Sequence, residues 1–324
     1  MGDVRKIIAA LLALLLMCCT GCGHRTIQAS SFALDTEVTI RLYAGGEEQD
    51  AEAALACIDS CERLLSAHRE GSDISALNAS DGQPVPVDAL TAQVLVRALD
   101  IGRETEGALD VTLLAASELW NYKSDCPRVP RQAEIDEALR WKGMERIAVE
   151  GSVVTAKEVR IDLGAVAKGA IGDEARVLLR ERGVTCALLN LGGNILTLGQ
   201  KPDGSDWVVA IEDPAGEGCV GTVAFSGSRA VATSSGAQRY FEAEGVRYHH
   251  ILDPETGFPA RSGIASATVL APDGLTADAL STALFVMGEE CAEQLLQRYP
   301  DCAAVLVRED GTVRTLGAVD FTCD

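Results

Sequence analysis

The sequence comprises 324 residues, of which 47% are hydrophobic, so the chain can bury a large core as one big domain or two small ones. Its formal net charge of -20 argues against a surface that binds nucleic acid or an anionic membrane, because the long-range field would repel phosphates. Any phosphate that the chain binds must therefore be held locally, by a metal, a lysine or backbone N–H groups.

The N-terminal segment has the order of a secretory signal peptide. Arg5 and Lys6 precede an apolar run of roughly a dozen residues, and Thr20-Gly21-Cys22 follows that run. Small residues directly before a cysteine resemble the lipobox of bacterial lipoproteins, so we expect cleavage after residue 21 and lipidation of Cys22. An uncleaved membrane anchor is the alternative, although the run is short for a spanning helix. Either way, the sequence predicts that the body of the protein is exported and tethered.

Hydrophobic periodicity and turn residues predict a mixture of helices and strands in the rest of the chain. In chain order we expect a strand over 32–43, helices over 47–67 and 88–104, a short helix over 133–140, short strands over 146–164, a helix over 165–182, strands from 186 to 268, a helix over 276–287, and a last helix and strand pair. Regular βαβ alternation is missing from this order. The pattern therefore predicts an α+β fold, with mixed, largely antiparallel sheets flanked by helices.

The cysteines carry little functional signal. Of the 11 cysteines, eight lie beyond Cys22, and their scatter gives no zinc-binding pattern. Cys57 and Cys61 share one face of the helix predicted over 47–67, and we interpret them as small apolar core residues. Export permits disulfides, but the pairing cannot be deduced from the sequence.

Two glycine-rich segments are candidates for binding a phosphate-bearing ligand. VRIDLGAVAKGAIGDEA brings Asp162 to the start of a predicted helix, with Lys168 in its first turns, and the helix start and the lysine together would attract an anion. The alternative is a helix-capping Asp162 and a solvated Lys168. In ALLNLGGNILTLG, Gly192-Gly193 follows a buried strand, where paired glycines indicate either a close approach of backbone to a ligand or another strand, or a plain tight turn.

A third segment, GLTADALSTALFVMG, is typical of a buried helix that carries two polar ligands. Asp278 and Thr282 are four residues apart, so their oxygens lie on one helix face and would suit Mg²⁺. An unpaired buried carboxylate is costly, so Asp278 needs a partner, and a buried arginine or lysine is the rival to a metal. Asp110, in EGALDVTLLAASELW, is equally well explained by a helix-to-strand connection.

Two of the four histidines stand side by side at the end of a predicted hairpin. The hairpin, RYFEAEGVRYHHIL, has its tip near Glu244-Gly245, and a tight turn begins directly after it. Alternation along the second strand places His249 and His250 on opposite faces. One interpretation makes His250 a hydrogen-bonded core residue and His249 a surface residue, and the other gives His250 a role in catalysis.

Taken in order, FALDTEVTI, ALDVT, IDLGAVAKGAIGD, NLGGN, HILDPETGFP and ADALSTALFVMG resemble the ApbE family of flavin transferases. Members of this family move FMN from FAD onto a threonine hydroxyl of a partner protein. The resemblance runs from about Phe32 to the C-terminus and implies a signal peptide over 1–21, a short tether over 22–31 and an ApbE-like single large domain over 32–324. It also implies that the protein is anchored by lipid to the outer face of the bacterial cytoplasmic membrane, or to the periplasmic side of a membrane.

The resemblance further implies a set of site residues. Those expected to contact FAD are Leu34, His68, Ala108, Leu109, Asp110, Asp162, Lys168 and Ile251. Mg²⁺ would be held by Asp278, Thr282 and the backbone oxygen of Ala165. His250 matches the histidine tied to transfer and is the candidate general base, with a pKa near neutrality, although Asp162 or Asp278 could take that part.

Several functions remain open on the sequence alone. Water could replace threonine at the same site, which would give FMN and AMP by hydrolysis. A lipid-anchored FAD-binding protein without chemistry and an extracellular adhesion module are the other classes. The acceptor implied by the resemblance is an exported or membrane-bound electron-transfer protein that carries flavin on threonine. Ser266-Ala267-Thr268 resembles an acceptor motif, but its β-branched alternation predicts an internal strand, so we do not expect self-flavinylation.

Overall fold

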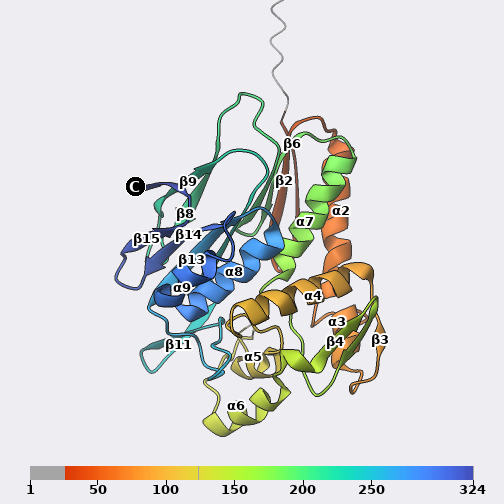
Figure 1. Cartoon of the computed structure of the whole chain (residues 1–324), viewed down its shortest axis with the longest axis vertical. Helices are drawn as coiled ribbons and strands as arrows, with labels where there is room; N and C mark the ends of the chain where they lie inside the picture. Colours follow the sequence, from red (N-terminus) through yellow and green to blue (C-terminus); the bar gives the residue numbers. More distant parts are fainter. Residues whose placement is uncertain (1–25, 123, 324) are drawn as a thin grey trace, which may run out of the picture.

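The computed structural model describes residues 26–122 and 124–323 (Figure 1). The signal peptide and Cys22 lie outside this part of the chain, so the expected cleavage and lipidation stay predictions. The centre is an eight-stranded sheet in the order β1-β2-β6-β7-β10-β13-β14-β15. Its strands are β1 (Ile27–Ala33), β2 (Thr36–Ala44), β6 (Cys186–Leu191), β7 (Asn194–Leu198), β10 (Ala230–Ser235), β13 (Ile264–Ala271), β14 (Ala303–Arg308) and β15 (Val313–Leu316). Neighbouring strands in this sheet run antiparallel, as predicted.

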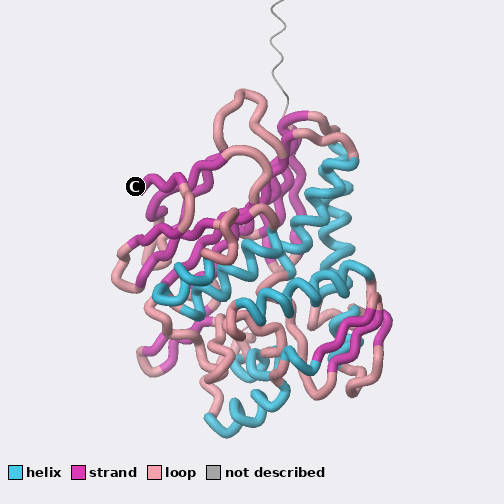
Figure 2. The backbone as a smooth tube through the Cα atoms, viewed as in Figure 1, coloured by secondary structure: helices cyan, strands magenta, loops and turns pink. Residues whose placement is uncertain are grey.

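Helices cover one face of this sheet and bury the largest part of the core between themselves and the strands (Figure 2). They are α2 (Glu48–Leu65), α7 (Ala167–Glu181), α8 (Gly274–Met287) and α9 (Glu289–Leu296), and α4 (Ala89–Glu104) packs on α2 and α8. Helix α8 contacts α7 on one side and lies across β10 and β13. Nearly all of α8 is buried, as the sequence predicts, because its apolar residues surround the helix instead of forming one stripe.

A smaller sheet covers the opposite face of the central sheet. It consists of β8 (Trp207–Glu212), β9 (Cys219–Phe225) and β16 (Asp320–Cys323), with β9 in the middle. Trp207 and Phe225 from this sheet pack against Val231 and Val305 of the central sheet, which makes a second hydrophobic cluster. The central sheet is therefore buried on both faces here, and its strands carry continuous apolar runs.

The remaining elements lie at the end of the molecule that carries α5 and α6 in Figure 1. They are α3 (Asp73–Asn78), β3 (Val85–Pro86), α5 (Leu114–Trp120), α6 (Gln132–Ala138), the 3-10 turns Leu139–Trp141 and Met144–Arg146, β4 (Ile147–Glu150), β5 (Val153–Ala156), β11 (Tyr240–Ala243) and β12 (Val246–His249). Strands β11 and β12 form a two-stranded hairpin of their own. Its tip is at Glu244 and Gly245, both with positive φ, as predicted.

The expected single strand over 32–43 is wrong. The chain forms a hairpin in which β1 pairs with β2 around a tip at Leu34 and Asp35, whose φ angles are 56° and 58°. Residues 27–31, expected to belong to the tether, are therefore part of a sheet strand. Turns of this type favour asparagine and glycine, so Leu34-Asp35 gives no turn signal in the sequence.

The connection after Asp110 also differs from the expectation. The chain makes a turn at Val111 and Thr112 and then enters helix α5, so Asp110 joins two helices and does not lead into a strand. Leucine, alanine and glutamate in LLAASELW favour a helix. The β-branched pair before it, Val111 and Thr112, forms a turn and not the start of a strand. In the described part of the chain, no helix is both long and apolar enough to span a membrane.

Candidate functional site

Helices α7 and α8 cross with their backbones in contact. A Cβ atom added to Gly169 of α7 would lie 2.0 Å from the carbonyl oxygen of Gly274, and one added to Gly274 would lie 2.4 Å from the carbonyl oxygen of Gly169. Only glycine allows this approach, because a side chain on either helix would separate them. The crossing brings the first turn of α7, with Lys168, against the polar side chains of α8.

Asp278 accepts a hydrogen bond across this crossing. The N–H of Gly169 donates to Asp278 Oδ2 over 3.0 Å, and Asp278 is only 9% exposed. Burial raises the pKa of Asp278 to about 6, against the opposing effects of the Asn194 amide, the Gly169 N–H and the Lys168 ammonium group. Asp278 therefore has two protein partners at the start of α7, the Gly169 N–H and the charge of Lys168, the second being of the kind considered from the sequence as the rival to a metal.

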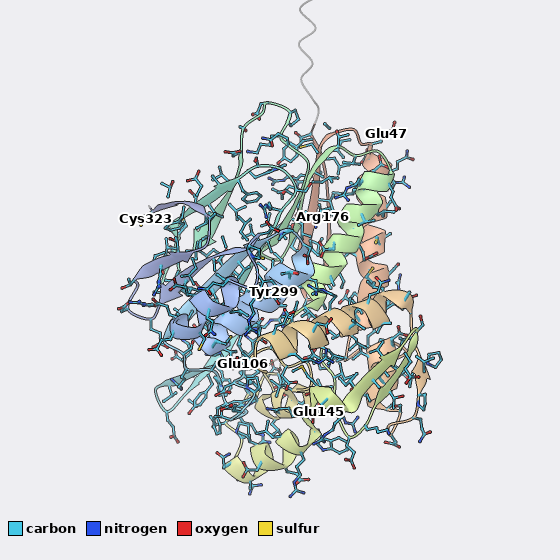
Figure 3. The ribbon with its side chains drawn as sticks, viewed as in Figure 1. Glu47, Glu106, Glu145, Arg176, Tyr299 and Cys323 are labelled. Carbon is cyan, nitrogen blue, oxygen red and sulfur yellow. The ribbon has the colours of Figure 1, made fainter. Side chains whose placement is uncertain are left out.

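A second carboxylate, Asp173, ties the same helices in the opposite direction. The N–H groups of Gly274 and Leu275, at the start of α8, donate to Asp173 Oδ1 and Oδ2 over 2.8 and 3.0 Å. Arg176, labelled in Figure 3, donates to Asp173 over 2.8 Å and to the Pro272 carbonyl over 3.1 Å. Each helix thus supplies a carboxylate for the N-terminus of the other. Sequence reasoning did not single out Asp173, and its signal is the Gly-Ala-Ile-Gly-Asp spacing at the start of α7.

The residues expected to hold Mg²⁺ fit a small hard cation by their chemistry. Asp278 and Thr282 share one face of α8, and Ala165 lies in the turn directly before α7. The Thr282 hydroxyl is 3.1 Å from the Ser234 hydroxyl on β10, which fixes its side chain. One carboxylate, one hydroxyl and one carbonyl are oxygen ligands of the kind that Mg²⁺ accepts alongside water and phosphate oxygens. Groups of three or more His, Cys, Asp or Glu side chains suited to a metal do not occur within 26–122 and 124–323.

Lys168 lies at the second position of α7, close enough to Asp278 and to His250 to influence the pKa of both. Asp162 precedes this helix, and its Oδ1 accepts the N–H of Gly164 over 2.9 Å. The residue that caps α7 is Val166, so the alternative of a capping Asp162 is wrong. Asp162 instead closes a local turn that leads to the helix start, where the positive end of the helix dipole and Lys168 would attract an anion.

Two turns, Leu34-Asp35 and Gly192-Gly193, lie next to each other at one end of the central sheet. Strand β2 pairs with β6, so the Leu34-Asp35 turn lies beside the Gly192-Gly193 turn. A Cβ atom at Gly192 would lie 2.3 Å from the Thr36 hydroxyl, so both interpretations of the glycine pair hold: a tight turn and a close approach. Directly after it, Asn194 is only 6% exposed, and its Nδ2 has no hydrogen-bond partner of normal geometry within the described chain, although its amide lies near Asp278.

The two histidines differ from the expectation in two ways. His249 is not a surface residue: its Nε2 lies 3.0 Å from the Ala260 carbonyl, and its ring meets Phe285 edge to face. His250 lies past the end of β12, with Nδ1 3.3 Å from the Arg239 carbonyl. Burial first, and then the charge of Arg239, lower the pKa of His250 to about 4, so the expected near-neutral pKa is wrong.

The other residues expected to contact FAD are distributed unevenly. Leu109 and Ile251 are buried in the core, so only their backbone groups could reach a ligand. Ala108 and Asp110 lie in the turn after α4. Burial raises the pKa of Asp110, and hydrogen bonds from Thr112 oppose this effect. His68 is exposed beyond the end of α2. The expected core position of Cys57 and Cys61 is confirmed, since both pack in the main cluster.

Comparisons with known proteins identify a family, relatives and a solved structure that resemble this chain. The model of the ApbE family matches residues 34–306. A FAD:protein FMN transferase of Treponema pallidum is 34% identical over 94% of this chain and 92% of its own length. A FAD:protein FMN transferase of Haemophilus influenzae is 30% identical over 98% and 96%. The crystal structure of the ApbE protein from Thermotoga maritima superposes with a TM-score of 0.83 at 34% identity, over 90% of this chain and 97% of that one.

Proposed function

The chain belongs to the ApbE family and is an FAD:protein FMN transferase, and we propose that it acts with Mg²⁺ on a threonine hydroxyl of its partner and releases AMP. The observation that carries this proposal is the α7–α8 crossing. It gathers a buried carboxylate, a lysine and the start of a helix at one point, and His250 lies within electrostatic reach of that lysine. An anionic diphosphate is the ligand that such a set recognises.

The phosphates of FAD bind at the start of α7. The positive end of the helix dipole and the Lys168 ammonium group hold the pyrophosphate, and the turn closed by Asp162 keeps the chain in place before the helix. Asp278, Thr282 and the Ala165 carbonyl would hold Mg²⁺ beside it, and that ion would neutralise charge that develops on the phosphates as the bond breaks. Leu34, His68, the 108–110 turn and the Ile251 backbone are the proposed contacts to the rest of FAD.

His250 is the proposed base for the acceptor hydroxyl. Because its Nδ1 faces the Arg239 carbonyl, Nδ1 carries the proton and Nε2 keeps the lone pair. A lowered pKa keeps the ring neutral at pH 7, and the negative charge of bound phosphates would raise its basicity. The threonine oxygen attacks the FMN phosphorus, its proton moves to His250 Nε2, and the bond from that phosphorus to AMP breaks. Asp162 and Asp278 are the alternative bases.

The proposal is tested by measuring AMP and the flavin products together. Purified protein lacking residues 1–22 is incubated with FAD and Mg²⁺, with and without an acceptor domain that carries a threonine. The proposal predicts AMP formation that depends on the acceptor and matches the amount of FMN bound to it. Equal AMP formation without the acceptor, with free FMN, would instead identify hydrolysis, and intact FAD would indicate a binding protein.

We also propose that the protein is exported and anchored by lipid at Cys22, with its domain outside the cytoplasmic membrane. The support is the order of the N-terminal sequence alone. Its acceptor is then an exported or membrane-bound electron-transfer protein. Metabolic labelling with palmitate should mark the full-length protein and not Cys22→Ala, whereas equal labelling of both would rule out Cys22 as the lipid-bearing residue.

A further inference from the structure

The segment that carries His250 follows a hairpin that stands apart from the central sheet. Within residues 26–122 and 124–323, strands β11 and β12 pair only with each other, so the hairpin makes no ladder with the central sheet. An isolated two-stranded hairpin is marginally stable in water. The position of His250, which follows β12 directly, therefore depends on what the hairpin and the next turn rest on.

They pack on residues from the α5–α6 region, which lies at the same end of the molecule (Figure 1), and His249 also packs on Phe285 of α8. Three donors from this region reach three carbonyls on the two sides of the turn that follows His250. The Tyr122 hydroxyl donates to the His249 carbonyl over 2.6 Å, Lys142 Nζ to the Pro254 carbonyl over 2.8 Å, and Trp120 Nε1 to the Gly257 carbonyl over 3.1 Å. His250 thus lies between carbonyls that are each fixed by a side chain.

The aromatic rings make these bonds rigid. Trp120 is fully buried, and the Tyr122 ring stacks on it at 5.9 Å with an interplanar angle of 10°. Phe241 and Tyr248 of the hairpin pack on Trp120 from one side, and Phe258 meets it edge to face. Because these rings pack on the Tyr122 ring, its hydroxyl is held at the His249 carbonyl. Burial also raises the pKa of Tyr122, so the hydroxyl keeps its proton and donates.

We propose that Tyr122 is a positioning residue for His250: its hydroxyl holds the His249 carbonyl, while Trp120 and Lys142 hold the far side of the same turn. The inference rests on the proposed function, because it matters for transfer only if His250 acts there. A shift of the imidazole by a fraction of an ångström is enough to misalign a proton transfer. Tyr122 itself touches no reacting atom, and it acts through the backbone of its neighbour.

The test replaces only the hydroxyl, with Tyr122→Phe, so that the stacked ring stays. Tyr240→Phe is the matched control, because Tyr240 is on the same hairpin but is 44% exposed. We expect kcat for FMN transfer to fall about tenfold in Tyr122→Phe, with KM for FAD unchanged and faster amide exchange confined to residues 249–257. Tyr240→Phe should match the wild type in all three measurements.

His250→Ala, measured in parallel, separates failure of this inference from failure of the proposed function. If His250→Ala is inactive while Tyr122→Phe transfers at the wild-type rate, the positioning role is refuted and the function stands. Loss of FAD binding and of thermal stability in Tyr122→Phe, in proportion to the lost rate, would also refute it, because the role would then be general stability. Wild-type transfer by His250→Ala would remove His250 from the mechanism, and the positioning role with it.

Discussion

The N–H of Gly169, in the first turn of α7, donates to the Asp278 carboxylate of α8 over 3.0 Å, and this contact joins the two halves of the site. It exists because glycine stands at both crossing positions, Gly169 and Gly274, and lets the helix backbones touch. The contact therefore fixes the Asp278 carboxylate, expected to bind a cation, next to the start of α7, expected to bind an anion. Changes at this crossing should therefore affect stability and ligand binding together.

Gly169→Ala tests the crossing directly. The new Cβ would lie 2.0 Å from the Gly274 carbonyl oxygen, so the helices must separate, and we expect the free energy of unfolding to fall by about 2–3 kcal/mol. Urea denaturation measures this. Gly216→Ala is the control, because the nearest atom to its Cβ would be 3.8 Å away, and its effect should stay within about 0.5 kcal/mol. Equal stabilities of the two variants would contradict the close crossing.

Asp278→Asn should stabilise the protein in the absence of metal and FAD. Burial raises the pKa of Asp278 to about 6, so its folded form holds a proton that the unfolded form has lost. The wild type therefore loses stability as the pH rises from about 4 to about 6, and asparagine removes this loss. We expect the variant to be more stable by about 2 kcal/mol at pH 8 and similar to the wild type at pH 4.

Addition of Mg²⁺ and FAD should reverse that order. Ligands that bind only the folded protein raise its thermal midpoint, so the wild type should gain more than Asp278→Asn. The two thermal midpoints are measured with each ligand alone and with both. A variant that is less stable than the wild type at pH 8, or that gains equally from Mg²⁺ and FAD, would contradict the place given to this carboxylate.

Lys168→Gln should weaken FAD binding while the fold stays intact. The lysine is at the second position of α7, where its charge adds to that of the helix start. Losing a charge-assisted contact of this kind should raise Kd for FAD by about ten- to a hundredfold, and calorimetry or fluorescence titration measures it. The dependence of Kd on salt should also become shallower. Lys157→Gln, at an exposed position, is the control, and an equal change in both variants would contradict a specific role for Lys168.

His250 should make the stability of the free protein depend on pH. Burial lowers the pKa of His250 to about 4, below the ordinary value of 6.5, so the unfolded chain binds a proton that the folded chain does not. Its contribution is complete above about pH 6.5 and is lost as the pH falls towards 4. His250→Gln should flatten the stability profile in this window by about 1–2 kcal/mol, while His68→Gln, at an exposed histidine, should leave it unchanged. A profile of His250→Gln parallel to the wild type would contradict the buried, neutral ring.

The parts of the site that were predictable from sequence are those with local spacing. Asp278 and Thr282 are one helical turn apart, so a buried helix places both oxygens on one face wherever it packs. The hairpin before His250 was equally predictable, because Glu244-Gly245 is typical of a turn that needs positive φ. The α+β class followed from the order of the elements, and the antiparallel central sheet confirms it.

The parts that could not be predicted depend on contacts between distant segments. Nothing in the sequence pairs Gly169 with Gly274, because glycines also mark turns and flexible ends. The burial of His249 was missed because alternation describes a strand, whereas the chain leaves the strand at this residue and turns towards Phe285. The Leu34-Asp35 turn was hidden because leucine seldom adopts positive φ, and only pairing with the neighbouring strand imposes it here.

The most direct measurement is the intact mass of an acceptor domain after incubation with FAD, Mg²⁺ and the protein lacking residues 1–22. We expect a mass increase equal to one FMN ester on a threonine, and we expect no increase without Mg²⁺ or with Asp278→Ala. An unmodified acceptor alongside free FMN and AMP, or modification that persists without Mg²⁺ and in Asp278→Ala, would contradict this expectation.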